Sequence, residues 1–417
     1  MTNPLLSILI ATKNRIPYCI QVIETILKLP DQDFELVIQD NSDSLELFDY
    51  AKGITDSRFV YNYSPPPFSS IDNFNKVISL SKGQYSCLIG DDDGINPDIF
   101  KIVRCASANN IDSIVPSLKA IYWWPDATKN IKGKENYNGL LSIGHLSSNI
   151  GLLSTDGEVE KLMKSGGQDY IDVNLPKLYH SIVKTKYLHS IKEKTGSFVG
   201  GLSPDIYISV ALASFIKKIV KIDYPIVIPG ICIASTSADS ATKTNTSKLE
   251  DAPHFRDRGE YFWAKQVPKF YSGVNIWADS AIASLTDLDQ LKLVDKFSIT
   301  DLVIVLLNRH NDYSDIILKH YFDSYNATSY LQRSYYLIAL KFKKSQNKFI
   351  NLSVRVIGKF KRSIASNNNK NKPENIRNVL NISQAIDKLN QHLVKNSISV
   401  DLIIKRLDTA KFKSKRD

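Results

Sequence analysis

Blocks of apolar residues alternate with polar turns along the first hundred residues of the chain. Short apolar runs at residues 5–11, 59–64 and 85–90 predict strands, and residues 34–43 repeat the pattern of a strand followed by a polar turn. Between the first two, apolar positions recur at helical spacing over residues 16–27. Strands that alternate with helices at this spacing indicate βαβ units. We therefore expect an α/β fold with a mainly parallel sheet.

Two further helices have recognisable start or stop signals. Before the fourth strand, Asp72 or Asn73 is the expected N-cap and Gly83 follows the last turn. Later in the chain, Ser203 stands before Pro204 as a helix N-cap. Both segments fit a sheet that is covered by helices.

After the first hundred residues, strand signals continue for a while and then give way to helical periodicity. Further strands are expected at residues 112–118 and 226–235, and helical periodicity dominates from about residue 280. A polar patch at residues 366–375 predicts a loop or linker. We expect a first domain over residues 1–275 and a helical, basic region over residues 276–417.

Three polar clusters directly follow predicted strands. They are Thr12–Arg15, Gln39–Asp43 and Asp91–Asp93. In open α/β sheets, ligands bind outside the carboxyl ends of the parallel strands. The three clusters are therefore expected at one edge of the sheet, where they would form a binding site.

The third cluster places Asp91, Asp92 and Asp93 side by side, and such charges repel wherever water is excluded. An EF-hand calcium loop does not fit, because Ile89 and Phe100 would occupy ligand positions. The P-loop and dinucleotide-binding glycine motifs are absent from the sequence. The remaining chemistry is a divalent cation, Mg²⁺ or Mn²⁺, that holds a phosphate ligand. The alternative is three surface carboxylates in a turn.

Four segments carry a resemblance to a known family. SILIATKNR, VIQDNSD, DNFNKVISLSKGQY and CLIGDDDG follow one another over residues 7–94. Together they resemble the nucleotide-sugar-binding half of family 2 glycosyltransferases with the GT-A fold. The resemblance implies a Rossmann-like, mostly parallel sheet flanked by helices. It also implies an inverting transfer of a sugar from a nucleoside diphosphate, with UDP favoured, to a glycan or lipid-linked acceptor.

The resemblance assigns roles to individual residues. Asp93 would bind the metal of the family's DxD motif, Asp91 would lie on the ribose or beside the metal, and Asp40 would bind uracil. The expected nucleotide contacts are Thr12, Asn14, Arg15, Asp40, Lys82, Asp91 and Asp92. Turn capping is the alternative for Asp40. For Lys82, a contact with the donor phosphates stands beside a favourable position at a helix C-terminus.

Asp205 is implied as the general base that takes the proton from the acceptor hydroxyl, because it begins a helix well downstream of the acidic triplet. The Glu-Asp pair that is common in the family is absent there, so Asp169 and Asp172 are substitutes and a helix-dipole role is the alternative. His254 is a candidate ligand for the metal or diphosphate, or else an ordinary surface histidine. Trp123 and Trp124 are expected in the core rather than against a sugar ring.

The charge of the chain is concentrated at its end. The 417 residues carry a net charge of +10, and residues 341–417 hold 19 Lys and Arg against 5 Asp and Glu. Such a segment attracts an anionic membrane or nucleic acid, or is a solvated helical face. Nucleic acid is not expected as a partner, because the basic excess lies outside the domain that carries the motifs.

Other sequence features bear on the compartment and on rival functions. No apolar run reaches the ~18 residues of a membrane span, and the four scattered cysteines suit a reducing compartment. We expect a cytoplasmic enzyme of surface polysaccharide synthesis, peripheral on the inner face of the plasma membrane. The alternatives are a sugar-1-phosphate nucleotidyltransferase, whose Gly-rich loop after the first strand is missing here, and a non-catalytic basic protein that binds membranes or nucleic acid.

Overall fold

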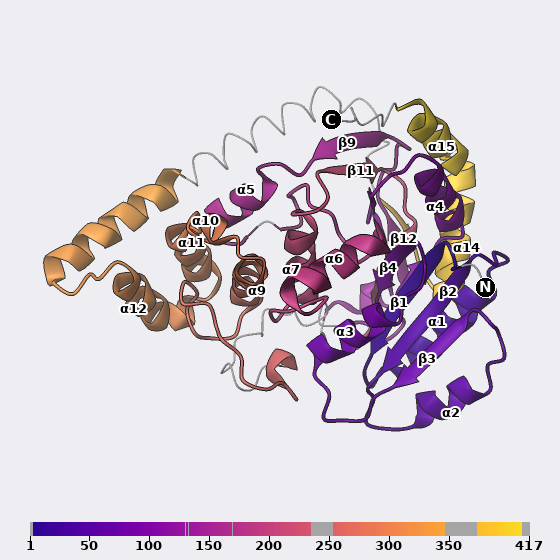
Figure 1. Cartoon of the computed structure of the whole chain (residues 1–417), viewed down its shortest axis with the longest axis horizontal. Coiled ribbons are helices and arrows are strands. Elements are labelled where there is room, and N and C mark those ends of the chain that lie inside the picture. The colour runs from indigo at the N-terminus through magenta and orange to yellow at the C-terminus, as the bar shows by residue number, and fades with distance from the viewer. Residues whose placement is uncertain are drawn as a thin grey trace.

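A computed structural model describes most of the chain. The described residues are 3–129, 131, 133–168, 170–234, 253–346 and 373–410. At the centre lies an eight-stranded sheet with the strand order β3-β2-β1-β4-β10-β6-β11-β9, and helices surround it (Figure 1). Its strands are β1 (Leu6–Thr12), β2 (Phe34–Asp40), β3 (Phe59–Tyr63), β4 (Tyr85–Ile89), β6 (Ser113–Pro116), β9 (Ile150–Ser154), β10 (Ile182–Lys184) and β11 (Lys218–Ile222).

The half of the sheet that carries the sequence motifs is parallel. Strands β1, β2, β3 and β4 pair in parallel, and so do β6 and β11. Strands β9 and β10 run antiparallel to their neighbours. The pairs Thr12↔Asp40 and Ile10↔Ile89 bring the carboxyl ends of β1, β2 and β4 to one edge. The expected α/β fold, with a mostly parallel sheet flanked by helices, is confirmed.

Alternate residues of β1 enter two different cores, because successive side chains of a strand point to opposite faces. Ile8 and Ile10 pack into a core with α1 and α4, whereas Leu9 packs into a core with α3, α6 and α7. The helices of this three-layer arrangement are α1 (Ile16–Leu27), α2 (Glu46–Lys52), α3 (Ser70–Ser79), α4 (Ile99–Ala108), α5 (Glu158–Lys164), α6 (Thr185–Thr195) and α7 (Pro204–Leu212). Ser203 occupies the N-cap position of α7 as expected, although its hydroxyl donates to Asp205 and does not accept a backbone N–H of the helix.

The start of α3 differs from the sequence prediction. Its N-cap is Ser69, whose hydroxyl accepts the backbone N–H of Asp72, while the Asp72 carboxylate accepts the N–H of Ser69. Asp72 is therefore the third residue of a capping box and not the N-cap.

The prediction of a single strand over residues 226–235 is also wrong. It is divided into β12 (Val227–Ile228) and β13 (Gly230–Ile231), which belong to different sheets. Pro229, which lacks a backbone N–H, separates them. The small sheets pair β12 with β5 (Gly94–Ile95), and join β13, β7 (Ala120–Trp123), β8 (Leu140–Ile143) and β14 (Glu374–Ile376) in that order.

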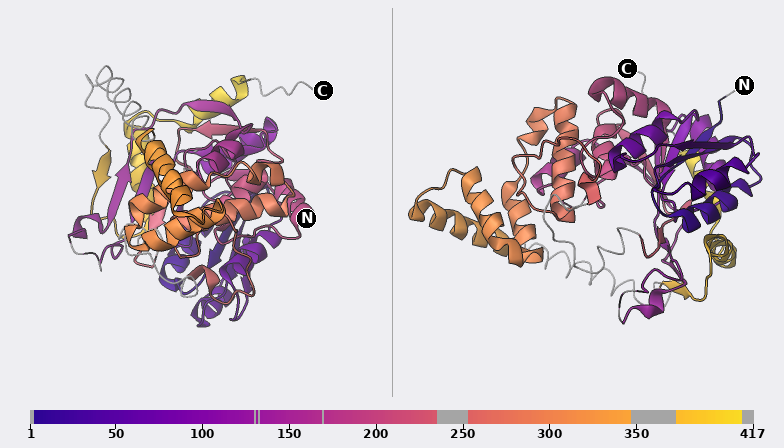
Figure 2. Two further views of the ribbon diagram at one scale, coloured as in Figure 1. Left: turned by 90° about the vertical axis from the view of Figure 1, so that its left-hand side faces the viewer. Right: turned by 90° about the horizontal axis from the view of Figure 1, so that it is seen from below.

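The part of the chain after residue 275 is mainly helical and lies in two places. Helices α9 to α12 and the helical residues 330–346 form a second core with α5 and α7, and they extend away from the large sheet (Figure 2). In contrast, β14, α14 and α15 pack onto the first core, beside α1 and α4. The bounds are α9 (Gly273–Asp287), α10 (Leu291–Val294), α11 (Ile299–Arg309), α12 (Ser314–Ser324), α14 (Ile382–Lys395) and α15 (Val400–Thr409), with short 3₁₀ turns at Glu135–Tyr137, Pro253–Phe255 and Asn311–Tyr313.

Within the described parts of the chain, no helix combines the length and the apolar character needed to cross a bilayer.

Candidate functional site

The acidic triplet lies directly after β4, at the edge of the sheet where β1 and β2 also end. Asp91, Asp92 and Asp93 are only 3%, 4% and 2% exposed. Burying three carboxylates is unfavourable unless each has compensating donors. The partners of these side chains therefore define the site.

Asp91 is held by two residues of the loop that follows β1. The Thr12 hydroxyl donates to Asp91 Oδ2 at 2.6 Å, and Arg15 Nη1 donates to Asp91 Oδ1 at 2.8 Å. Burial raises the pKa of Asp91, and the Arg15 charge and the Thr12 hydrogen bond only partly offset this. Arg15 Nη1 also lies 3.5 Å from Asp92 Oδ1. The guanidinium thus bridges two carboxylates of the triplet.

Asp93 is held on the other side by a histidine and by two backbone amides. His180 Nε2 lies 2.7 Å from Asp93 Oδ2, which also accepts the N–H of Gly90 at 2.5 Å. Asp93 Oδ1 accepts the N–H of Gly230 at 2.7 Å. Burial alone would raise the pKa of Asp93, but the His180 interaction and the amide hydrogen bonds lower it below its usual range. The pKa of Asp91 is therefore raised, whereas the pKa of Asp93 is lowered.

Residues that follow β7 and β12 pack closely over Asp92. Trp124 Nε1 donates to the Asp92 carbonyl at 2.9 Å, and Cys232 N–H donates to Asp92 Oδ2 at 3.2 Å. A Cβ atom at Gly230 would lie 1.8 Å from the Asp92 carbonyl oxygen, so only glycine fits there. Trp124 is buried in the core, as expected.

The loop after β1 is tied to the loop after β2. Asn14 donates from Nδ2 to Asp43 Oδ2 at 2.7 Å, and its Oδ1 accepts the N–H of Asp43 at 2.9 Å. Asn14 adopts a left-handed backbone with φ of 59°. The two polar clusters therefore meet at one edge, as the strand pattern predicted.

Asp40 is fully buried at the end of β2. Its Oδ1 accepts the N–H of Ser42 at 2.8 Å, and its Oδ2 accepts the Tyr61 hydroxyl at 2.8 Å. The first bond has the geometry of an Asx turn. Asp40 thus caps the turn in this structure, and a bond to uracil requires one of these donors to give way.

Lys82 lies apart from the other candidate nucleotide contacts. It precedes β4, whereas the triplet follows this strand, so the five-residue strand separates them by about 16 Å. Lys82 lines a surface hollow of about 650 Å³ with Lys184, Lys186 and His189, at the amino ends of β1 and β4 and the carboxyl end of β10. The structure therefore does not bring Lys82 to the phosphate position that the resemblance implied.

Asp205 and His254 form a second cluster. Asp205 lies in the first turn of α7, where the Ser203 hydroxyl donates to its carboxylate. Burial lowers the pKa of His254, while the negative charge of Asp205 opposes this shift, so the two side chains lie close enough to interact. His254 Nδ1 is buried, and it has no hydrogen-bond partner within the described parts of the chain. His254 is thus mostly enclosed, which differs from the surface histidine of the alternative interpretation.

Residues 177–180 connect the two clusters along β4. The bridge Leu88↔Tyr179 and the 2.8 Å bond from His180 N–H to the Leu88 carbonyl align this segment with the strand. Burial raises the pKa of the Tyr179 hydroxyl, and the triplet charges raise it further. Burial lowers the pKa of Lys177, against the charges of Asp205 and Asp172. This short segment therefore lies within the electrostatic influence of the triplet at Tyr179 and of Asp205 at Lys177.

The substitute bases differ in what the structure says of them. Asp172 is exposed and close enough to Lys177 to affect its pKa. Asp169 lies outside the described residues.

The triplet as arranged here does not fit a divalent cation. Mg²⁺ needs one or two carboxylates besides phosphate oxygens, so the chemistry of the side chains is suitable. Each of the six carboxylate oxygens, however, already has a protein donor within 3.5 Å. No group of three His, Cys, Asp or Glu side chains in the described part of the chain could hold a metal ion. An ion would have to displace Arg15, His180 or an amide.

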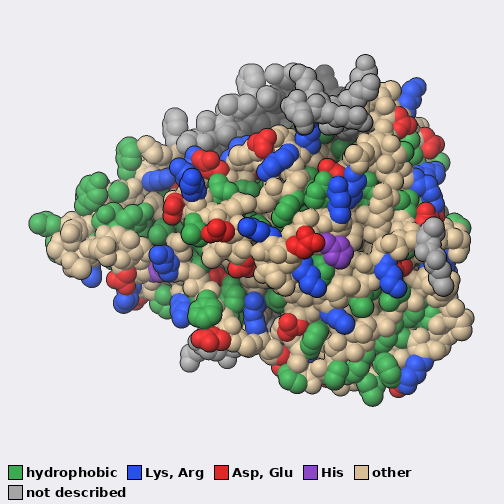
Figure 3. All heavy atoms as spheres, viewed as in Figure 1, with side chains coloured by type: hydrophobic (Ala, Val, Ile, Leu, Met, Phe, Trp, Pro, Cys, Tyr) green, Lys and Arg blue, Asp and Glu red, His purple; other side chains and the backbone are tan. Residues whose placement is uncertain are grey.

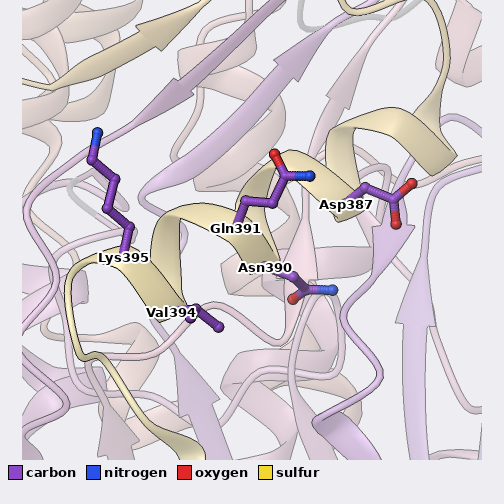
Figure 4. Close-up of a pocket in the computed structure, with 5 residues that line it drawn as sticks. All are labelled: Asp387, Asn390, Gln391, Val394 and Lys395. Atoms are coloured by element: carbon purple, nitrogen blue, oxygen red, sulfur yellow. The ribbon is translucent and has the colours of Figure 1, made fainter.

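A second surface hollow, of about 580 Å³, lies on α14 (Figure 4). Its described lining residues are Asp387, Asn390, Gln391, Val394 and Lys395. All five come from a single helix, and no residue of the acidic triplet is among them. This hollow therefore does not belong to the candidate site.

Sequence reasoning missed His180 and Gly230 as parts of the site. His180 follows a segment without clear periodicity and approaches Asp93 only through the pairing with β4, with a φ of 60°. Gly230 was placed inside a predicted strand. A glycine next to Pro229 was the one local signal of a close backbone approach.

Part of the chain is similar to known proteins. Residues 7–148 match the family model described as Glycosyl transferase family 2. A curated relative, the putative colanic acid biosynthesis glycosyl transferase WcaA of Escherichia coli (strain K12), is 30% identical over 98 residues. That match covers 23% of this chain and 35% of the relative, so the chain spans about a third of the length of the curated relative.

Solved structures of S. aureus TarS are also similar at low identity. TarS 1–349 in complex with UDP-GlcNAc is 12% identical with a TM-score of 0.44, covering 78% of this chain and 82% of that chain. The same fragment in complex with UDP is 12% identical with a TM-score of 0.39. This match covers 78% of this chain and 88% of that chain.

The acidic triplet and the loops after β1 and β2 lie within the part of the chain that matches this family model, whereas His180 and Gly230 lie outside it. Over residues 7–148, the chain is similar to glycosyl transferase family 2.

Proposed function

We propose that this protein transfers a sugar from a nucleoside diphosphate, with UDP favoured, to a hydroxyl group of a glycan or lipid-linked acceptor, with inversion at the anomeric carbon. The observation that carries this proposal is the convergence of Thr12, Arg15 and His180 on the buried carboxylates of Asp91 and Asp93. A buried cluster of opposed charges at a sheet edge is typical of a ligand site.

The donor would lie along the edge formed by β1, β2 and β4. Thr12, Asn14 and Asp40 end the first two strands or follow them, on the side where a nucleoside would bind. Arg15 supplies a fixed positive charge, because burial and the two carboxylates hold it in place. A guanidinium pairs well with phosphate oxygens, so Arg15 is suited to bind the diphosphate.

In the proposed reaction, the bond between the anomeric carbon and the phosphate oxygen breaks, and its electron pair stays on the leaving diphosphate. The acceptor oxygen bonds to the anomeric carbon from the opposite face. Asp205 takes the proton of the acceptor hydroxyl as general base. Its place in the first turn of α7, close enough to His254 for its charge to affect the pKa of that side chain, supports this assignment.

The metal dependence implied by the family, on Mn²⁺ or Mg²⁺ with Asp93, Asp91 and His254 as ligands, is tested separately. Asp91 and Asp93 belong to one cluster, whereas His254 belongs to the cluster of Asp205. Chelation with EDTA followed by metal addition should show whether the reaction needs an ion. The charge and hydrogen bonds described here do not depend on one.

We further propose a role in surface polysaccharide synthesis at the cytoplasmic face of the membrane. The curated relative bears the name of a colanic acid biosynthesis enzyme, which supports this class of pathway. The basic C-terminal part supports peripheral contact with anionic lipid.

The test is release of UDP from a panel of UDP-sugars by the full chain, with and without an acceptor. Asp93→Asn should reduce UDP release by about 100-fold or more, whereas Asp49→Asn, an exposed carboxylate on α2, should leave it unchanged. Asp205→Asn should lower kcat by about 100-fold with little change in the donor KM. Failure to bind UDP and to release it would refute the proposal. Consumption of a sugar-1-phosphate with release of pyrophosphate would indicate a nucleotidyltransferase instead.

A further inference from the structure

The helical residues 330–346 present an apolar side to the surroundings. Leu331, Tyr335, Ile338 and Phe342 are 79%, 67%, 67% and 65% exposed. Their spacing of four, three and four residues places them on one face of a helix. We call these four residues the apolar stripe. Tyr330, 83% exposed, lies at its beginning.

The opposite face of this helix holds it to the protein. Leu340 is buried and Tyr336 packs in the second core. Lys343 Nζ lies 2.7 Å from Asp301 Oδ2, and the Arg333 guanidinium lies 5.5 Å from the Phe322 ring centroid. The orientation of the helix is therefore fixed, and the apolar stripe faces outward as a consequence.

The stripe lies at one end of the molecule. The helix is the unlabelled orange one beyond α12 in Figure 1, at the end opposite to β2 and β3. Hydrophobic side chains gather at the same end in the space-filling view (Figure 3). Contiguous exposed apolar patches of this kind mark surfaces that contact another body, either a protein or a membrane.

Charge decides between these two kinds of partner. Residues 330–346 contain Arg333, Lys341, Lys343 and Lys344 and no Asp or Glu. Asp301 neutralises Lys343, which leaves Lys341 and Lys344 without an ion pair among the described residues. A second copy of the chain would bring the same positive charges against this helix and be repelled. An anionic lipid surface has the opposite charge.

We propose that the apolar stripe of residues 330–346 docks this protein onto an anionic bilayer. Leu331, Ile338 and Phe342 would enter the boundary between headgroups and acyl chains, as the apolar face of an interfacial helix does. Tyr335 suits the same depth because its ring is apolar and its hydroxyl is polar. The inference rests on the proposed membrane contact and deepens it, since it identifies the contacting surface.

The test is co-sedimentation of the full chain with vesicles of phosphatidylcholine containing about a third phosphatidylglycerol, compared with phosphatidylcholine alone. Deletion of residues 341–417 is unsuitable as a variant, because α14 and α15 belong to the first core. The variant is Ile338→Gln with Phe342→Gln, whose side chains are mostly exposed in water and do not support the fold. The matched control is Leu291→Gln with Leu380→Gln, which are 51% and 63% exposed elsewhere.

Binding to the anionic vesicles should fall at least about tenfold for the stripe variant and stay unchanged for the control. Lys341→Gln with Lys344→Gln should also reduce it, and should do so less in high salt. Unchanged binding by the stripe variant would overturn the assignment of the surface. Loss of self-association by the stripe variant, with no vesicle binding by the original chain, would show a second copy as the partner. UDP release is measured in parallel without vesicles, so failure of the proposed catalysis is detected independently.

Discussion

His180 Nε2 lies 2.7 Å from Asp93 Oδ2 across 87 positions of sequence. The pair exists because residues 178–180 run beside β4, where His180 N–H donates to the Leu88 carbonyl at 2.8 Å. The geometry of the acidic triplet therefore depends on a segment that no local motif identifies.

Replacing His180 should change the pH dependence of the reaction. The His180 contact helps to lower the pKa of Asp93, so His180→Ala should raise that pKa. The proposed reaction needs the ionised form of Asp93, so the acidic limb of kcat/KM should move to higher pH. UDP release measured between pH 4 and 8 checks this, with the exposed His189→Ala as control. An unmoved limb together with normal activity would mean that His180 does not act on Asp93.

Arg15 should contribute far more to stability than an exposed arginine with an equally short ion pair. Arg15→Ala leaves Asp91 and Asp92 buried without their cation, which should lower the free energy of unfolding by about 3 kcal/mol. Arg104 pairs with Asp31 at 2.6 Å, but its side chain is 48% exposed. Arg104→Ala should cost less than about 1 kcal/mol. Urea unfolding of both variants measures the difference, and equal losses would contradict the described burial of the triplet.

Gly230 should tolerate no side chain. The added methyl group of Gly230→Ala would meet the Asp92 carbonyl oxygen at 1.8 Å, so β13 or the triplet must move. We expect a loss of about 3 kcal/mol in the free energy of unfolding. Gly259→Ala is the matched control, since a Cβ there has no atom within 4 Å, and it should change stability by less than about 0.5 kcal/mol. Similar melting temperatures for the two variants would refute the close approach.

Asp279 should make stability depend on pH. Burial in α9 raises its pKa to about 6, although the Ala264 N–H, the Tyr261 hydroxyl and the Arg258 charge act in the opposite direction. The folded state thus holds a proton that the unfolded state releases near pH 4. This contribution is fully present below pH 4 and is lost as the pH rises through 6, at a cost on the order of 3 kcal/mol.

The Asp279→Asn variant isolates this contribution. It keeps an acceptor for the Ala264 N–H but cannot ionise, so the decrease in stability between pH 4 and 6 should be smaller than in the original chain. Chemical denaturation at half-unit pH steps measures both curves. Parallel curves would show that Asp279 does not titrate in this range.

The elements near the motifs could be predicted because local signals and tertiary structure agree there. The strands β1 and β4 and the start of α7 at Pro204 lie within one residue of the bounds that the apolar runs and the helix-start signal predict. The carboxyl-edge rule then places Thr12, Arg15 and Asp91 together from sequence alone. These are contacts between neighbouring strands, which strand order largely determines.

The rest of the site depends on contacts that sequence spacing does not encode. His180 and Gly230 contact Asp93, although they lie 87 and 137 positions further along the sequence. Lys82 was assigned to the phosphates from its resemblance to a motif, but the length of β4 separates it from the triplet. The buried donors of Asp40 and the enclosed ring of His254 likewise come from packing, which a single sequence does not reveal.

The return of β14, α14 and α15 to the first core has a consequence for synthesis of the chain. Ile382, Leu389 and Ile403 fill spaces beside residues that leave the ribosome several hundred positions earlier. The apolar surface that they cover stays open until residues 374–409 have been synthesised. Because such distant contacts form slowly, a nascent chain of this protein would present that surface to chaperones while the residues in between are being added.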